Sequence, residues 1–356
     1  MSSSCTCSSQ SNGCGSSAQP DNKASWITGA IETSTGSVPT ISTELSRGDR
    51  LNAVKVRWGI GRMKYQVPPG LYAVGQPDRT SPVLVTANYK LTFDRLRSRL
   101  SEINAWILVL DTKGINVWCA AGKGTFGTDE LVNRIRASGL EQVVDHRKII
   151  LPQLGAPGVA AHIVKKSTGF KVEYGPVYAQ DIPGYILNQF QVKPEMRRVR
   201  FPLRDRLALI PMELIPALKF VPIFLAWLVI VQLLRDHRLS VSILRDLVPY
   251  LSAILSGAVL FQILLPWLPF RSFIINGWLL GGAVILALCA LTGFESSFFL
   301  PLLLILPPIS AFLAVNFTGS TTFTSLSGVR KELSLGVPVM ILSVVAGIVI
   351  QIVMSV

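Results

Sequence analysis

The chain has 356 residues, of which 49% are hydrophobic and only 15% are charged, and its formal net charge is +13. In soluble domains about a quarter of the residues are charged, so this composition excludes a disordered chain, a collagen-like repeat and an ordinary soluble enzyme. A charged, water-soluble half is followed by a membrane half, because the only charged residues after position 246 are Arg271, Glu295, Arg330, Lys331 and Glu332.

Residues 1–50 are rich in Ser, Gly, Thr and Asn and predict a flexible tail. No signal-peptide pattern is visible, so we expect the soluble half to face the cytoplasm. The five cysteines of the chain are Cys5, Cys7, Cys14, Cys119 and Cys289. Their odd number argues against a disulfide framework. The first three could hold a soft metal, although a complete zinc or iron–sulfur site normally needs a fourth ligand and none is nearby.

Between residues 51 and 192, short apolar strands alternate with amphipathic helices. We expect strands at residues 82–87, 105–110, 148–151 and 170–174. We expect helices at residues 92–100, 129–137 and 159–166, with Thr128 as the N-cap of the second. This alternation predicts an α/β, Rossmann-like domain with a parallel sheet. Ligands of such sheets bind at the carboxyl ends of the strands, which here are residues 86–88, 111–123 and 152–157.

Residues 193–213 form a basic linker, and apolar segments follow it. The basic residues lack interleaved aromatic side chains, so we expect a juxtamembrane anchor and not a nucleic-acid site. The apolar segments, which predict an all-α transmembrane domain over residues 214–356, are 214–234, 247–268, 273–291, 298–317 and 335–356. Lys219 and several prolines interrupt the first, so four or five spans are expected. The hydroxyl-rich residues 316–328 are either a plain loop or a substrate-facing one.

The densest local signal is NVWCAAGKGTFGT at residues 116–128. Its small residues would let a large flat ligand approach the backbone. Cys119 presents a soft sulfur beside helix N–H groups and Lys123, which together favour a thiolate that can bind a transition metal. A phosphate loop is not expected, because Lys123 is followed by glycine and not by Ser or Thr. From composition alone, a buried structural cysteine remains the commoner alternative.

The segment NVWCAAGK at residues 116–123 resembles the signature of the HgcA family of mercury-methylating corrinoid proteins. The soluble domain of that family is similar to the corrinoid iron–sulfur protein of acetyl-CoA synthesis. Further similar segments are residues 69–75, 81–94, 146–148, 154–157 and 316–329. The resemblance implies a base-off corrinoid (cobalamin-type) over the strand ends, with Cys119 as catalytic residue and lower axial ligand of cobalt. The cofactor-binding residues that it implies are Thr86, Asn88, Asn116, Val117, Trp118, Cys119, Ala120, Ala121, Gly122, Lys123, Leu154 and Gly155.

The same resemblance implies a corrinoid-dependent methyltransferase of the inner membrane, with its corrinoid domain in the cytoplasm. Methyl would pass from a methylated folate donor to mercury(II) thiolates, forming methylmercury, and electrons would come from HgcB, a ferredoxin-like protein with iron–sulfur clusters. A thiolate opposite the methyl group would favour its departure as a carbanion or radical, while Trp118 and Asn116 would shield and orient the sulfur. One alternative is a membrane-bound methyl carrier for another acceptor in one-carbon metabolism. A transporter is disfavoured, because the apolar segments contain few ionisable residues.

Overall fold

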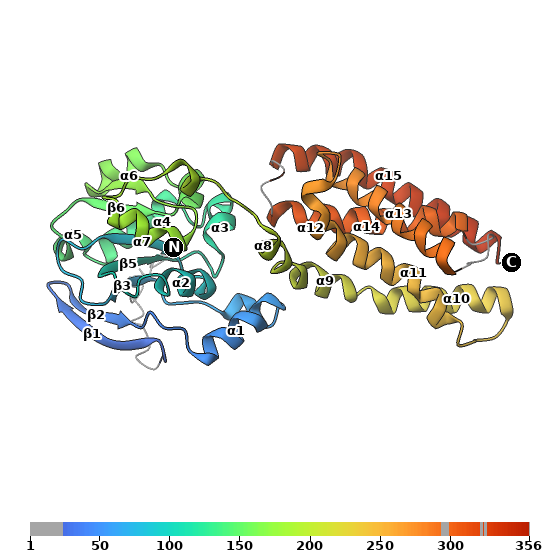
Figure 1. Cartoon of the computed structure of the whole chain (residues 1–356), viewed down its shortest axis with the longest axis horizontal. Coiled ribbons are helices and arrows are strands. Elements are labelled where there is room, and N and C mark those ends of the chain that lie inside the picture. The colour runs from blue at the N-terminus through green and yellow to red at the C-terminus, as the bar shows by residue number, and fades with distance from the viewer. Residues whose placement is uncertain (1–23, 293–298, 321–322, 324–325, 356) are drawn as a thin grey trace, which may run out of the picture. The chain divides into compact units, whose positions relative to one another are not determined.

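The computed structural model describes residues 24–292, 299–320, 323 and 326–355 (Figure 1). The chain forms two compact units, which we describe separately. The first, the α/β unit, contains the described residues up to Arg50 together with Met63–Arg198. The second, the helical unit, contains Leu51–Arg62 and the described residues from Val199 onward. Cys5, Cys7 and Cys14 lie outside the described residues, so their predicted metal chemistry stays a prediction.

The α/β unit is built on one seven-stranded mixed sheet with the order β1-β2-β3-β5-β4-β6-β7. Its strands are β1 Ile27–Thr33, β2 Gly36–Ile41, β3 Gly70–Val74, β4 Val83–Ala87, β5 Ala105–Leu110, β6 Lys148–Leu151 and β7 Lys171–Tyr174. Strands β4 to β7 pair in parallel, so their carboxyl ends meet at one edge of the sheet. β3 runs antiparallel to β5, and β1 forms an antiparallel hairpin with β2.

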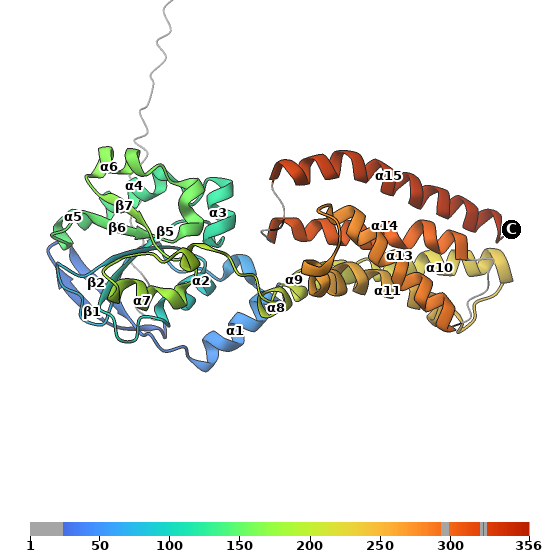
Figure 2. The same ribbon diagram turned by 45° about the horizontal axis from the view of Figure 1, so that its top comes forward.

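Helices cover both faces of this sheet (Figure 2). They are α2 Lys90–Arg97, α3 Val117–Lys123, α4 Thr128–Ala137, α5 Leu140–Val143, α6 Ala161–Thr168 and α7 Ile182–Leu187. Helix α1 Arg47–Arg57 starts in this unit, but its residues from Leu51 onward belong to the helical unit. Alternate residues of β4 and β5 point to opposite faces. Leu108 and its neighbours pack under α3 to α6, whereas Ile107 packs with Phe93 of α2 and Tyr185 of α7. The predicted α/β fold class is confirmed.

Three sequence predictions about this unit are wrong in detail. Residues 27–41 form the hairpin β1–β2 and not a flexible tail, because Trp26, Val38 and Ile41 are buried and hold it to the sheet. The sheet is mixed and not parallel, because β3 runs antiparallel to β5 and the sequence pattern does not predict β3 as a strand. Thr128 is the first residue of α4 and not its N-cap, which is Gly127. The Thr128 hydroxyl instead accepts a hydrogen bond from the Ala160 N–H at 2.9 Å.

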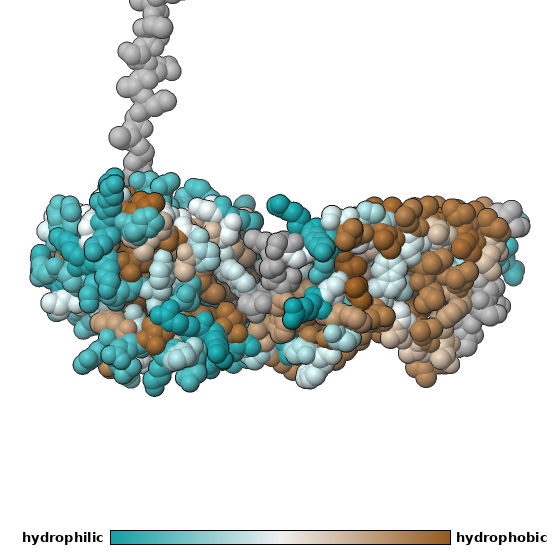
Figure 3. All heavy atoms as spheres, turned by 90° about the horizontal axis from the view of Figure 1, so that it is seen from above, coloured by the Kyte–Doolittle hydropathy of each residue, from teal (hydrophilic) through white to brown (hydrophobic). Residues whose placement is uncertain are grey.

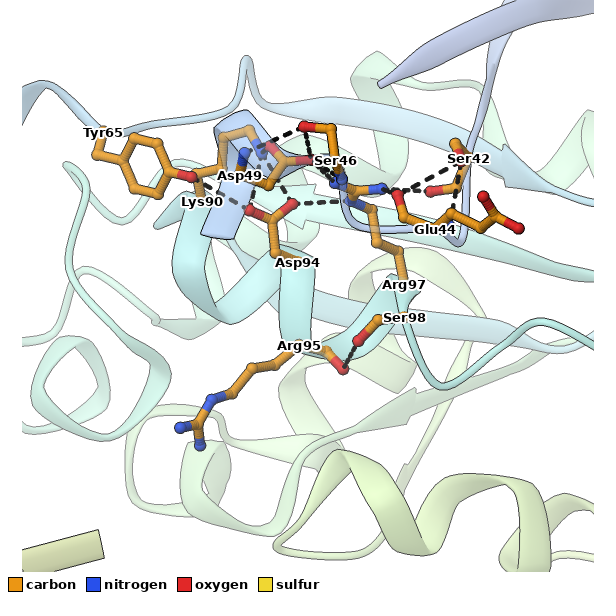
Figure 4. A network of polar contacts seen from close by, with 10 residues as sticks. All are labelled: Ser42, Glu44, Ser46, Asp49, Tyr65, Lys90, Asp94, Arg95, Arg97 and Ser98. Carbon is orange, nitrogen blue, oxygen red and sulfur yellow. Dashed lines mark hydrogen bonds and ion pairs between the residues drawn. The ribbon is translucent and has the colours of Figure 1, made fainter. Parts of the chain in front are cut away.

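A buried cluster of two acids and two bases holds α1 and the hairpin to α2 (Figure 4). Lys90 Nζ lies 2.7 Å from Asp49 Oδ1 and 2.8 Å from Asp94 Oδ2. Arg97 bonds to the same two carboxylates, at 2.9 Å and 2.7 Å. Arg97 Nη1 also donates to the carbonyls of Ser42 and Glu44, just beyond β2. Each of the two carboxylates therefore has both Lys90 and Arg97 as partners. Such pairing is needed because a buried charge without a partner is strongly destabilising.

The helical unit is apolar on much of its surface (Figure 3). Its helices are α8 Leu203–Leu207, α9 Ile210–Leu218, α10 Val221–Asp236, α11 Ile243–Leu255, α12 Phe261–Leu264, α13 Phe273–Thr292, α14 Phe299–Asn316 and α15 Leu326–Val353. Within the described residues, four continuous segments are long and apolar enough to cross a membrane, at 243–267, 273–291, 299–316 and 328–353. A fifth candidate, residues 203–236, is bent by 41° between α9 and α10. The predicted number of candidate spans, four or five, and the irregular first segment are confirmed.

Small residues bring the helices of this unit close together. Gly277 and Gly281 of α13 are four residues apart, and a Cβ at either would lie within 2.7 Å of α14 atoms, at Ala311 and Ser310 respectively. Such small-xxx-small pairs let membrane helices pack backbone to backbone. Cys289 is half-buried and packs against an apolar cluster that includes Leu302.

Two further segments differ from the sequence prediction. Arg206 of the basic linker is buried, donates to the Gln262 carbonyl at 3.1 Å and lies over the Trp267 ring, so it caps the end of a helix instead of meeting solvent. In the polar segment 316–328, residues 317–320 form a 3-10 turn and α15 begins at Leu326, nine residues before the predicted span. Residues 321–322 and 324–325 of that segment lie outside the described residues.

Candidate cofactor site

Helix α3 follows β5 at the carboxyl edge of the sheet and presents two different faces. Val117, Ala120 and Ala121 are buried against the sheet core, as their i, i+3, i+4 spacing requires. Trp118 and Cys119 are half-buried, while Gly122, Lys123 and Gly124 are exposed. The thiol therefore lies on the outward side of the helix, next to a surface of small residues.

Asn116 fixes the start of this helix. It is the N-cap, and its side-chain oxygen accepts the Cys119 backbone N–H at 2.9 Å. An Asn at this position satisfies an N–H group that would otherwise have no partner. The sequence predicts that Asn116 orients the Cys119 sulfur. In the structure Asn116 contacts the backbone of Cys119, so it positions Cys119 through the main chain.

The face of α3 opposite the thiol packs on the 3-10 segment Gln153–Gly158, which follows β6. A Cβ on Gly158 would lie 2.1 Å from the Phe126 carbonyl oxygen and 3.0 Å from the Ala121 Cα, so only glycine allows this approach. Gly155 is packed in the same way against the Phe126 ring, at 2.5 Å. Two glycines thus set the distance between α3 and the end of β6.

We expect Gly158→Ala to destabilise the α/β unit by about 1–3 kcal/mol, because the added methyl meets backbone atoms that cannot rotate away. Gly184→Ala is the matched control. It also replaces a glycine within a helix, but a Cβ at this position has no neighbour within 4 Å. The measurement is the thermal unfolding of the full chain in detergent, with hydrogen exchange of β4 and β5 as the local readout. Equal stabilities of the two variants would show that α3 has room to move.

The loop after β5 is organised by Asn88, which lies just beyond the end of β4. Its side-chain oxygen accepts hydrogen bonds from Thr112 N at 3.1 Å, from Thr112 Oγ1 at 2.8 Å and from Gly114 N at 2.9 Å. Its amide donates to Gln66 and to Asp111. Gln66 closes the other side, because a Cβ on Gly114 would lie 2.6 Å from its Nε2 atom. The hydrogen-bonding groups of the Asn88 side chain are therefore used within the protein.

Charged side chains tether the same loop to α4. The backbone N–H of Asp111 donates to Glu130 Oε1 at 2.8 Å, and Arg134 bonds to that oxygen from one turn further along the helix. Burial alone would raise the pKa of Asp111, but hydrogen bonds from Lys113 outweigh it and lower the pKa below its usual value. The loop is thus held in one conformation with an ionised carboxylate at its exposed end.

The predicted site residues fall into two groups. Cys119, Trp118, Gly122 and Lys123 lie on the outward side of α3, where a ligand can reach them. The others support this surface from beneath or beside it: Asn116, Val117, Ala120, Ala121, Thr86, Asn88, Leu154 and Gly155. Thr86 and Asn88 are only 2% exposed, so neither offers its side chain to a ligand. The sequence alone does not identify Gln66, Phe126 and Gly158; Gly158 closes the 3-10 segment that follows β6, and no local motif marks its role.

The described residues around Cys119 do not form a protein-built metal centre, but they leave room for a flat ligand. Among the residues that the structure describes, no three His, Cys, Asp or Glu side chains gather around a common point. Cys119 would therefore be a single protein ligand, which is too few for a protein-built zinc or iron site. A Cβ on Gly122, three residues further along α3, would meet no atom within 4 Å, so the surface beside the thiol is open to a flat ligand.

The fold is that of a mixed α/β domain followed by candidate membrane helices. Residues 60–186 match the family model of the CO dehydrogenase/acetyl-CoA synthase delta subunit, CdhD. Over 127 residues the chain is 33% identical to the acetyl-CoA decarbonylase/synthase complex subunit gamma of Methanopyrus kandleri, and 34% identical to that of Archaeoglobus fulgidus. Each alignment covers 35% of this chain and 27% of the relative.

The chain thus spans about a quarter of the length of the curated relatives that it matches. The matched residues include strands β3 to β7, the whole of α3 and Cys119. The α/β unit therefore contains a CdhD-family domain that is distantly related to the gamma subunits of acetyl-CoA decarbonylase/synthase complexes.

Proposed function

We propose that this chain is a membrane-bound corrinoid methyltransferase that passes a methyl group to mercury(II) and forms methylmercury. The observation that carries the proposal is the placement of Cys119 on the outward face of a short helix at the carboxyl edge of the sheet. The relationship to acetyl-CoA decarbonylase/synthase subunits supports the cofactor class, because the sequence resemblance assigns corrinoid binding to that family. The choice of mercury rests on the resemblance of the NVWCAAGK segment alone.

The residues of α3 would hold the cofactor from one side. Cys119 would be the side chain that holds the metal, and Gly122 and Gly124 would let the ring lie close to the backbone. Asn116, Gly155 and Gly158 would keep the helix in place. A corrinoid supplies cobalt that accepts a methyl group and gives it up again.

A thiolate at Cys119 would suit an electrophilic acceptor. Mercury(II) accepts electrons, so transfer to it would require a methyl group that leaves with the bonding pair or as a radical. A thiolate that holds the metal would donate electron density to it and so favour either route. The half-buried Trp118 next to it would limit the access of water to the sulfur. Re-reduction would require an external electron donor, for which a ferredoxin-like protein is the proposed partner.

A single-turnover assay tests this proposal. The purified full chain in detergent is loaded with methylcobalamin that carries a deuterated methyl group, and mercury(II) bound to a small thiol is added. We expect deuterated methylmercury in an amount that approaches the bound cofactor. Transfer of the label to other thiol-bound metals but not to mercury would support instead the alternative of a methyl carrier for another acceptor.

A second variant tests the cofactor surface without touching the sulfur. Gly122→Ala adds a methyl group to the exposed side of α3, where the protein has space for it. Stability should therefore be kept or slightly raised, whereas binding of corrinoid, followed by its visible absorption, should weaken. Unchanged binding would place the cofactor elsewhere.

A further inference from the structure

The segment from the start of α1 to residue 64 exposes an unusual amount of apolar surface. Its exposed apolar residues are Leu51, Val54, Trp58, Ile60 and Met63, each with between 52% and 64% of its surface accessible. Leu51, Val54 and Trp58 follow the i, i+3, i+7 spacing of one helix face. Exposure of this size within thirteen residues marks a surface that contacts something apolar.

The same segment is strongly basic. Residues 47–64 contain the six basic residues Arg47, Arg50, Lys55, Arg57, Arg62 and Lys64. The single acid, Asp49, points inward to Lys90 and Arg97, so it does not offset the charge at the surface. Burial would raise the pKa of Asp49, but the hydrogen bond and charge of Lys90 lower it to about 2, which keeps this carboxylate ionised. Basic residues around an apolar face that includes Trp are typical of helices that lie in the headgroup region of anionic membranes.

The position of the segment in the fold points to lipid in preference to another partner. Residues 51–62 belong to the helical unit. Arg62 Nη1 lies 3.0 Å from the Met212 sulfur of α9, in the first half of the bent candidate span. The segment therefore contacts a helix of the same unit that is itself part of a candidate membrane span.

From these observations we infer that residues 47–64 form an interfacial membrane-binding segment, whose apolar face enters the headgroup layer of an anionic bilayer. The segment is a second membrane contact that precedes the first candidate span by about 140 residues of chain. Asp49 anchors its beginning to α2, and Gln66, two residues after its end, touches the loop at Gly114. Binding of this segment to lipid would therefore also limit the movement of Gln66, whose side chain contacts the loop after β5 at Gly114.

Quenching of Trp58 by brominated lipid tests this inference. The full chain is placed in nanodiscs of brominated phosphatidylglycerol and phosphatidylcholine, and the emission of Trp58 is taken as wild type minus Trp58→Phe. We expect brominated lipid to remove roughly half or more of this emission, because Trp prefers the interface. Trp106→Phe gives the control difference, since Trp106 is buried in the sheet and should not be quenched.

The charge requirement is tested with a matched pair of variants. Arg50→Gln combined with Lys55→Gln should weaken quenching of Trp58, and raised salt should do the same because it screens surface charge. Lys165→Gln combined with Lys166→Gln removes two exposed charges from α6 and should have no effect. A Trp58 that stays unquenched in anionic discs but is reached by a water-soluble quencher would overturn the inference, as would equal quenching in discs without anionic lipid. Circular dichroism checks that each variant is folded.

Discussion

Cys119→Ala is expected to lower methyl transfer to mercury(II) by at least about 100-fold while the α/β unit remains folded. Changes to groups that merely support a metal ligand already cost about 10–100-fold, and this change removes the proposed ligand itself. The stability should change little, because the side chain is only half-buried and its backbone N–H keeps the bond to Asn116. The measurement is the single-turnover yield of deuterated methylmercury, together with the visible spectrum of the bound cofactor.

Two companion variants make this result specific. Cys289→Ala removes a second half-buried cysteine, in the helical unit, and should leave the yield unchanged. Cys119→Thr keeps a polar side chain of similar size but has no sulfur, so it should be as inactive as the alanine variant. Full activity of Cys119→Ala would exclude the sulfur as a cobalt ligand, and it would leave the lipid contact of residues 47–64 untouched because that inference has a separate readout.

The sequence predicted four of the seven strands, and the pattern is clearest in the two whose burial is complete. Strands β4 and β5 are buried at every position and are apolar apart from Thr86, because helices cover both faces of the sheet; such runs are recognisable without knowledge of their partners. The hairpin β1–β2 lies at the sheet edge and carries exposed Ser, Thr and Gly, so its composition resembles that of a loop. Its few buried residues pack against elements far away in the chain.

The candidate site was predictable to the extent that it is local. The segment 116–123 holds both the cysteine and the N-cap that orders it, so adjacent residues sufficed to identify them. Gly158 and Asn88 act on α3 and on the loop after β5 from other strands, 39 residues after and 31 residues before Cys119 in the chain. A single sequence carries no signal that pairs them, because their roles depend on the order of the strands in the sheet.

The acid and base cluster of Figure 4 also joins residues that are far apart in the chain. Breaking it should lower the stability of the α/β unit strongly. Lys90, Asp94 and Arg97 lie on one face of α2, but their fourth member, Asp49, comes from α1. We expect Arg97→Met to destabilise the α/β unit by about 3–5 kcal/mol. Removal of one base leaves two carboxylates in an interior that solvates them poorly, while methionine keeps the volume of the aliphatic stem.

Arg79→Met is the matched control, because Arg79 pairs with Asp145 on the surface, where both side chains are more than half exposed. Exposed pairs contribute about 0–1 kcal/mol, so this variant should unfold almost as the wild type does. Urea unfolding of the full chain, followed by hydrogen exchange of α2 and β2, measures both variants. Similar losses in the two would mean that water reaches the cluster and screens its charges.

The cluster also predicts how acid destabilises the unit. Burial would raise the pKa of Asp49, but the hydrogen bond and charge of Lys90 outweigh it and lower the pKa from 3.8 to about 2. A carboxylate whose pKa is lower in the folded state stabilises that state above its unfolded pKa and loses the effect as the pH falls. Asp49 should therefore contribute about 2 kcal/mol above pH 4, and this contribution should decline between about pH 4 and pH 2. Asp49→Asn removes it, so the difference in unfolding free energy between wild type and variant should shrink over that interval. A difference that is constant from pH 5 to pH 2 would show that Asp49 has the same affinity for protons in the folded and unfolded chain.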